Sequence, residues 1–216
     1  NPTGHLIENS QLRELLASLR QAGDALLICD EIYQGLQYDA SPQTACALGE
    51  DDVIVINSFS KYFGMTGWRV GWLVAPEALM APMERLAQNI FLAAPTSAQH
   101  AALAAFSEES LDILERRREA FRERRNFLHG ALDQLGFGVG ERPRGAFYIY
   151  ADATPFTQDS TKFAQQLLAE TGVAVTPGSD FGVHRAKCHV RFAYTTALDR
   201  LALGVERLRG FLRAGG

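Results

Sequence analysis

Lys61 and Arg69 are the residues whose types and spacing most directly suggest chemistry. Lys61 follows the apolar run 53–56, which predicts a buried strand. A lysine just beyond such a strand lies at the edge of the sheet where open α/β folds bind ligands. Arg69 follows eight residues later, across two glycines, and its planar guanidinium suits phosphate. A lysine, an arginine and nearby hydroxyls are what a phosphorylated cofactor with an aldehyde group needs. The alternative interpretation is that Lys61 is an ordinary solvated loop residue.

Two further segments place polar residues where chemistry is expected. Asp30 and Tyr33 follow a second apolar run, 25–28, and the chain opens with the tetrapeptide NPTG at 1–4. Each has an ordinary structural explanation as well. Proline and glycine make NPTG good turn chemistry, Asp30 is suited to capping a turn, and Tyr33 to a core position with a hydrated hydroxyl.

Four motifs in order carry a resemblance to a known family: NPTG at 1–4, DEIY at 30–33, SFSK with GWR at 58–69, and HVRF at 189–192. In this order and spacing they resemble the pyridoxal-phosphate (PLP)-dependent aminotransferases of classes I and II, which have fold type I. The resemblance spans nearly the whole chain.

The resemblance implies a catalytic set of Lys61, Asp30 and Tyr33. Lys61 would form the Schiff base with the cofactor aldehyde, because a desolvated lysine amine is nucleophilic. Asp30 would pair with the pyridine nitrogen and strengthen the ring as an electron sink. Asn1 and Tyr33 would donate hydrogen bonds to the phenolic oxygen of the ring.

The resemblance also implies which residues bind the cofactor phosphate and the substrate. Ser58 and Arg69 would hold the cofactor phosphate, while Ser60 receives no role. Arg191 lies in a segment whose alternation predicts a half-buried strand. With Asn1 it would bind the substrate, because its rigid fork matches a carboxylate in two parallel bonds. A surface cation is the ordinary alternative for Arg191.

Composition narrows the partners. The 216 residues include 21 basic and 25 acidic side chains, a balance that argues against nucleic acid or an anionic membrane as partner. No apolar run approaches the length of a membrane span, and no secretory leader opens the sequence. Three well-separated cysteines are typical of reduced thiols in a cytoplasmic protein, and the histidines lack metal-ligand spacing.

Predicted helices and strands alternate along the chain. Helices are expected over 10–20 with Ser10 as its cap, 76–89, 97–108, 110–135, 161–171 and 197–213, and strands before Asp30 and Ser58 and over 70–74, 145–150, 173–176 and 188–194. The runs before Asp30 and Ser58 are apolar enough to be buried on both faces, as in parallel sheets.

This pattern predicts an α/β fold: the C-terminal part of a fold type I large domain, with a central mostly parallel sheet, followed by a small α/β domain. The large-domain portion is expected over 1–114 and the small domain over 115–216, with the boundary inside the long helix. Compared with the family, the chain is expected to be a C-terminal fragment that is poorly active alone.

The predicted function is amino-group transfer between an L-amino acid and a 2-oxo acid, in a protein that is a homodimer at full length. Two alternatives stay open at this stage. One is a PLP-dependent lyase of the same fold, and the other is the aminotransferase-like domain of a transcription regulator.

Overall fold

The computed structural model describes residues 1–214 and divides them into two compact units. We call Leu6–Arg118 the lysine unit, and residues 1–5 together with the chain from Glu119 onward the arginine unit. Helix α4 (Glu108–Leu135) contributes its first turns to the lysine unit and its remainder to the arginine unit. The domain boundary expected between residues 114 and 115, inside this helix, stays a prediction.

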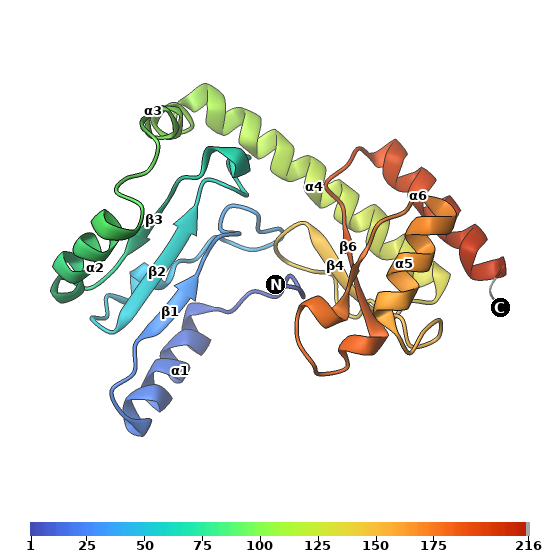
Figure 1. Cartoon of the computed structure of the whole chain (residues 1–216), viewed down its shortest axis with the longest axis horizontal. Helices are drawn as coiled ribbons and strands as arrows, with labels where there is room; N and C mark the ends of the chain where they lie inside the picture. The colour runs from blue at the N-terminus through green and yellow to red at the C-terminus, as the bar shows by residue number, and fades with distance from the viewer. Residues whose placement is uncertain (215–216) are drawn as a thin grey trace. The chain divides into compact units, whose positions relative to one another are not determined.

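The lysine unit is a short sheet with helices around it (Figure 1). Its elements besides α4 are α1 (Asn9–Ala22), β1 (Leu27–Asp30), β2 (Val53–Ser58), β3 (Gly71–Val74), α2 (Glu77–Ile90), α3 (Thr96–Ala104) and two 3₁₀ turns, Ala45–Leu48 and Thr66–Trp68. The strands run in the order β1-β2-β3. β1 is parallel to β2, with Asp30 opposite Ile56, and β3 returns antiparallel, with Gly71 opposite Ser58.

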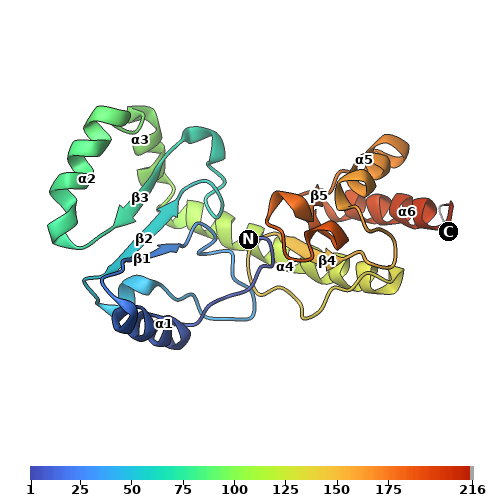
Figure 2. The same ribbon diagram turned by 60° about the horizontal axis from the view of Figure 1, so that its bottom comes forward.

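One face of this sheet carries a hydrophobic core. Leu12 and Leu16 of α1 pack with Val53 and Val55 of β2, and α1 lies along β1 in Figure 2. On the opposite face Ile28 is 60% exposed. The expectation of burial on both faces is therefore wrong for β1, whereas in β2 the consecutive residues Val53, Ile54 and Val55 are all buried. In β1 the pattern alternates because successive side chains point to opposite faces and α1 covers one of them.

Helix α1 begins earlier than the sequence suggested. Its N-cap is Glu8 and not Ser10. The Glu8 carboxylate accepts from the backbone N–H of Gln11, and the Gln11 amide oxygen accepts from the backbone N–H of Glu8 at 2.9 Å. This reciprocal capping box satisfies two backbone donors at the helix start, which explains why the helix begins two residues earlier.

The arginine unit is a second, antiparallel sheet with helices. Its elements besides α4 are β4 (Tyr148–Asp152), α5 (Ser160–Thr171), β5 (Thr176–Pro177), β6 (His189–Ala193), α6 (Leu198–Ala214) and two 3₁₀ turns, Gly178–Asp180 and Ala186–Cys188. The strand order is β4-β6-β5. β4 starts later than expected because Ala146 adopts a positive φ of 62°, which interrupts extended backbone.

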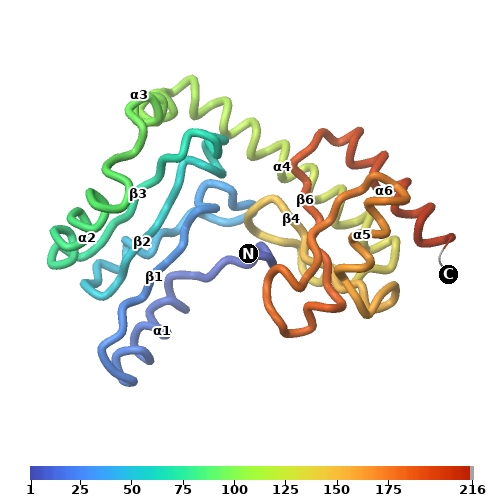
Figure 3. Tube along the Cα trace, viewed as in Figure 1, coloured from blue at the N-terminus to red at the C-terminus, as the bar shows by residue number. Residues whose placement is uncertain are grey.

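The first residues of the chain belong to the arginine unit. The backbone N–H of Gly145 donates to the carbonyl of Gly4 at 3.0 Å, and the blue start of the trace lies beside the segment that leads into β4 (Figure 3). Asn1 is thereby brought into the unit that contains Arg191. Within residues 1–214, none of the helices combines the length and the apolar character that crossing a bilayer requires.

Candidate cofactor and substrate site

Asp30 and Ser58 end neighbouring parallel strands, so both lie at the same edge of the sheet. Asp30 is exposed, and its Oδ1 accepts from the backbone N–H of Ile32 at 3.1 Å. This bond turns the chain immediately after β1 and leaves the second carboxylate oxygen available to a ligand. The turn then presents Tyr33, which is half-buried.

Lys61 lies close to Tyr33 in this unit. The Lys61 Nζ atom is 6.0 Å from the centroid of the Tyr33 ring. Its loop is closed by backbone and side-chain bonds: Gly64 N–H donates to the Lys61 carbonyl at 3.1 Å, and the Thr66 hydroxyl donates to the Ser60 carbonyl at 2.7 Å. The structure therefore brings together the lysine and the tyrosine that the sequence singled out.

Two hydroxyls occupy the start of the same loop. The Ser58 hydroxyl donates to the Ser60 hydroxyl at 2.8 Å, and the backbone N–H of Ser60 donates to Ser58 Oγ at 3.0 Å. Ser60, for which the sequence suggested no role, is buried and directly coupled to Ser58. The pair places two hydroxyls and their rotatable protons within one turn, a suitable donor set for an anion.

Arg69 precedes β3, and the pairing of β3 with β2 brings the chain back to the start of this loop. Gly71 pairs with Ser58 across β2 and β3, and the Phe59 N–H donates to the Val70 carbonyl at 3.2 Å. Arg69 itself has a φ of 56°, a conformation that a non-glycine residue adopts only with local strain. Its Nη1 donates to the Thr66 carbonyl at 2.9 Å. The strained turn thus anchors an exposed guanidinium to Thr66, whose hydroxyl in turn bonds the Ser60 carbonyl.

Arg191 is held by four side chains of the arginine unit. Its Nη1 donates to Asn1 Oδ1 at 2.8 Å and its Nη2 to the Thr176 hydroxyl at 3.4 Å. The guanidinium carbon lies 4.8 Å from the ring centroid of Tyr148 and 4.5 Å from that of Phe181. Both rings stabilise the cation and fix the plane of its fork.

The predicted site residues thus fall into two groups. Asp30, Tyr33, Ser58, Lys61 and Arg69 belong to the lysine unit, and Asn1 and Arg191 to the arginine unit. Sequence reasoning missed Ser60, Thr176 and Phe181 as neighbours of these groups. The alternation around Arg191 predicted a half-buried strand. Which residues face Arg191 depends on the register of β5 against β6, where Thr176 lies opposite Arg191.

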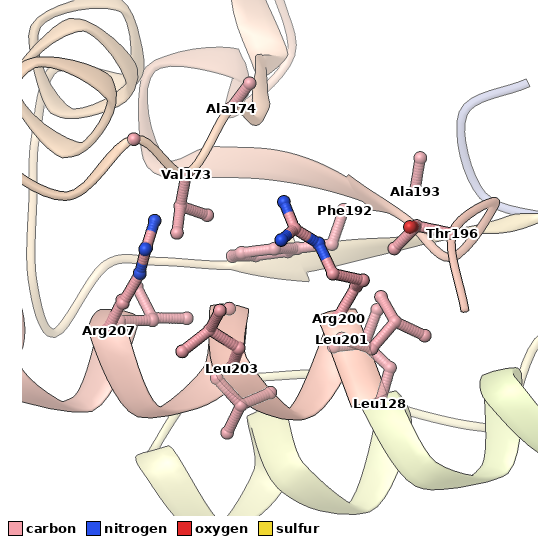
Figure 4. A pocket seen from close by; sticks show the side chains of 14 residues that line it. Leu128, Val173, Ala174, Phe192, Ala193, Thr196, Arg200, Leu201, Leu203 and Arg207 are labelled. Carbon is pink, nitrogen blue, oxygen red and sulfur yellow. The ribbon is translucent and has the colours of Figure 1, made fainter. Parts of the chain in front are cut away.

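A pocket in the arginine unit lies apart from these residues. It is bounded by α6, by the segment before β5 and by Phe192 and Ala193 of β6, with Arg200 and Arg207 rising from α6 (Figure 4). None of the seven predicted site residues lines it. Arg207 donates to the Thr171 carbonyl at 3.0 Å, so this cation is already used in holding the end of α5. The described residues that line the pocket include no lysine, cysteine, histidine or carboxylate, and we do not assign the chemistry to it.

Comparisons with known proteins define the class. The family model for aminotransferase class I and II matches residues 1–208, and the chain belongs to this family. A valine–pyruvate aminotransferase from Mycobacterium tuberculosis is 38% identical over 98% of the chain, and an aspartate/prephenate aminotransferase from Thermus thermophilus is 37% identical over 96%. A crystal structure of a putative aminotransferase from Silicibacter pomeroyi superposes with a TM-score of 0.91 at 43% identity, covering 99% of the chain and 57% of that structure.

The likeness to solved structures shows fold type I, and the mixed α/β structure of the chain is consistent with a C-terminal part of that fold. The chain spans about half the length of the curated relatives, 55% of the Mycobacterium protein and 53% of the Thermus protein.

The residues present fit pyridoxal phosphate, the cofactor on which this family depends. The Ser58–Ser60 hydroxyls and Arg69 supply phosphate donors, Lys61 supplies an amine, and Asp30 supplies a carboxylate with one oxygen outside its own turn. This donor set matches an anionic group, an aldehyde and a basic ring nitrogen in one ligand.

Proposed function

We propose that the protein of which these residues form part transfers an amino group between an L-amino acid and a 2-oxo acid. The observation that carries this proposal is the proximity of Lys61 to Tyr33 beside Asp30 and the serine pair. When bound, pyridoxal phosphate supplies an aldehyde that bonds amines and a ring that takes up negative charge from Cα.

Each residue has a defined task in this proposal. Ser58, Ser60 and Arg69 bind the phosphate, and Asp30 holds a proton on the ring nitrogen. Lys61 Nζ would take the proton from the substrate Cα and deliver it to the aldehyde carbon of the cofactor. Tyr33 orients the phenolic edge of the ring by a hydrogen bond.

Arg191 is proposed to bind the α-carboxylate of the substrate. Its contact with the Asn1 amide oxygen, together with the two flanking rings, supports this role because the fork is held in one orientation before substrate arrives. A preorganised cation loses less entropy on binding than a mobile one. We further propose a cytoplasmic homodimer at full length.

The side chain of the substrate stays open between the relatives. Proteins of nearly equal identity to this chain are named for valine and pyruvate in one case and for aspartate and prephenate in the other. The lyase and the regulator stay as alternatives, and Arg191 in its strand favours the transferase over the regulator because a carboxylate-binding cation serves amino-acid turnover.

The test of the proposal uses the lysines of the chain, which has three: Lys61, Lys162 and Lys187. Borohydride treatment of the cofactor-loaded full-length protein, followed by peptide mass mapping, should find the reduced adduct on Lys61. Lys61→Ala should abolish the adduct and the associated visible absorbance. Lys162→Ala is the matched control and should retain both. An adduct on Lys162 or Lys187 with Lys61 unmodified would overturn the assignment.

A further inference from the structure

Tyr62 directly follows Lys61 and packs against the turn that carries Tyr33. A Cβ atom added at Gly35 would lie only 2.5 Å from the Tyr62 Cγ atom. Gly35 also has a φ of 89°, a conformation that glycine adopts without penalty. The ring therefore closes onto the bare backbone of the Tyr33–Gly35 turn, an approach that no larger residue at 35 allows.

The hydroxyl of the same side chain reaches helix α4. It donates to Glu115 Oε1 at 2.6 Å, and Arg118 Nε donates to Glu115 Oε2 at 2.8 Å. Arg118 Nη1 in turn donates to the Gln37 carbonyl at 3.2 Å, just beyond the Tyr33–Gly35 turn. Tyr62, Glu115 and Arg118 thus connect the lysine loop to the aspartate–tyrosine turn by way of one helix.

Two more contacts run between the same segments. The Asn57 amide, buried at the end of β2, donates to Gln34 Oε1 at 2.8 Å. Gly64, in the lysine loop, lies against the guanidinium of Arg117, and a side chain at 64 would collide with it. Loop, turn and helix therefore meet along a continuous contact within the lysine unit.

From this geometry we infer that Tyr62 is a positioning residue, which holds the Lys61 loop and the Asp30–Tyr33 turn in fixed relation by bonding to Glu115. The inference rests on the proposed function, because it assigns to the lysine and the turn a shared ligand. Tyr62 itself does not touch the reacting atoms. Its ring sets the separation of the two segments, and its hydroxyl anchors both to α4.

The electrostatics support a bond of more than average strength. Burial and the hydrogen bond to Glu115 raise the pKa of Tyr62 to about 12. Burial would raise the pKa of Glu115, but the hydrogen bonds from Tyr62 and Arg118 outweigh it and lower that pKa. The pair therefore consists of a neutral phenol donating to a carboxylate, a charge-assisted bond.

Hydrogen exchange of the cofactor-free protein tests this inference. Tyr62→Phe keeps the ring on Gly35 and removes only the hydroxyl. We expect amides in 31–38 and 60–66 to exchange about tenfold faster, since a charge-assisted bond contributes that order of local stability. Glu115→Gln should speed the same two segments. Glu119→Gln, which breaks the equivalent exposed pair with Arg122 on α4, is the matched control and should leave both unchanged.

The outcomes separate this inference from the proposed function. Unchanged exchange in both segments in Tyr62→Phe and in Glu115→Gln would overturn the positioning role, whatever the cofactor does. Absence of any Lys61 adduct in the unsubstituted protein would overturn the proposed function and leave the exchange result standing. With both intact, Tyr62→Phe should still form the adduct on Lys61, but about fivefold more slowly because the amine is less well placed.

Discussion

At the scale of single residues, Arg191 is the most constrained of the proposed substrate groups. Its guanidinium lies between the rings of Tyr148 and Phe181 and bonds to Asn1 and Thr176. A lysine ammonium carries the same charge but has neither the plane that stacks on rings nor two parallel donors. The side chains around Arg191 therefore bind a planar guanidinium better than a lysine ammonium.

Arg191→Lys should consequently lower the activity of the catalytically active protein severely. We expect kcat/KM with amino-acid donors to fall by an amount equivalent to about 2–3 kcal/mol, the cost of charge-assisted bonds left unmade. Donor amines that lack a carboxylate should lose much less. Steady-state kinetics with both classes of donor measure the difference, and equal losses would show that Arg191 supports the fold instead.

The Tyr62–Glu115 bond also predicts a pH dependence. The folded pKa of Tyr62 is about 12, above the ordinary value of 10.0. A phenol whose pKa is raised by folding stabilises the protein fully below its unfolded pKa, and this contribution disappears as pH rises through the folded pKa. The groups that face it are Glu115, Arg117 and Arg118.

Unfolding of the unsubstituted protein and of Tyr62→Phe, measured by urea titration at pH 9, 10 and 11, tests this. The stability advantage of the unsubstituted protein should shrink as pH rises above about 10, since the variant has no phenol to ionise at this position. Titration of other groups affects both proteins and cancels in the difference. A difference that is constant or grows with pH would show that the Tyr62 pKa is not raised.

At the scale of elements, the turn after β1 depends on a glycine for two separate reasons. Gly35 has a positive φ, and a side chain there would strike the Tyr62 ring. Gly49 has a positive φ of 68° but open space around its Cα. The two glycines therefore separate backbone strain from collision.

Gly35→Ala should lower the free energy of unfolding by about 2–4 kcal/mol, and Gly49→Ala by about 1 kcal/mol, because only the first adds overpacking to the strain of a positive φ. Urea unfolding of both variants measures the two values. Combining Gly35→Ala with Tyr62→Ala should recover part of the first loss, since the collision with the ring atoms is then removed and only the closer approach to the Cβ atom at 3.1 Å remains. Equal losses for the two glycines would contradict the packing of the Tyr62 ring.

Much of this arrangement was predictable from the sequence. The features that were missed depend on contacts or caps that the sequence pattern does not reveal. Apolar runs ending in Asp30 and Ser58 predicted two strand ends, because burial and periodicity act within a few residues. The contact of Arg191 with Asn1, 190 positions away, follows from tertiary packing and is invisible to periodicity. The cap at Glu8 was missed because a serine two residues later is the more frequent choice. Ser60 was missed because its partner hydroxyl is found only once the loop is closed.

At the scale of the whole molecule, the lysine unit leaves much apolar surface in contact with solvent. β1 and β3 are the edges of its sheet, and every residue of β3 is exposed. Ile28 is 60% exposed on the open face, and Ile90 and Leu92 around the end of α2 are 74% and 80% exposed. Open strand edges and extended apolar surface promote association.

Residues 1–216, purified alone, should therefore associate with rising concentration, bind pyridoxal phosphate weakly and show no amino transfer. Light scattering coupled to gel filtration, cofactor absorbance and a transaminase assay measure these properties.

Ile28→Lys with Leu92→Lys should reduce association, because charges on the open surface oppose self-pairing. Val183→Lys is the control: this side chain is 97% exposed in a loop of the arginine unit, and its replacement should change nothing. The polypeptide that corresponds to the N-terminal part of the relatives, added in trans, should restore binding and turnover if it covers these surfaces. A monodisperse chain with stoichiometric cofactor and normal turnover would instead mean that the exposed sheet needs no partner for catalysis.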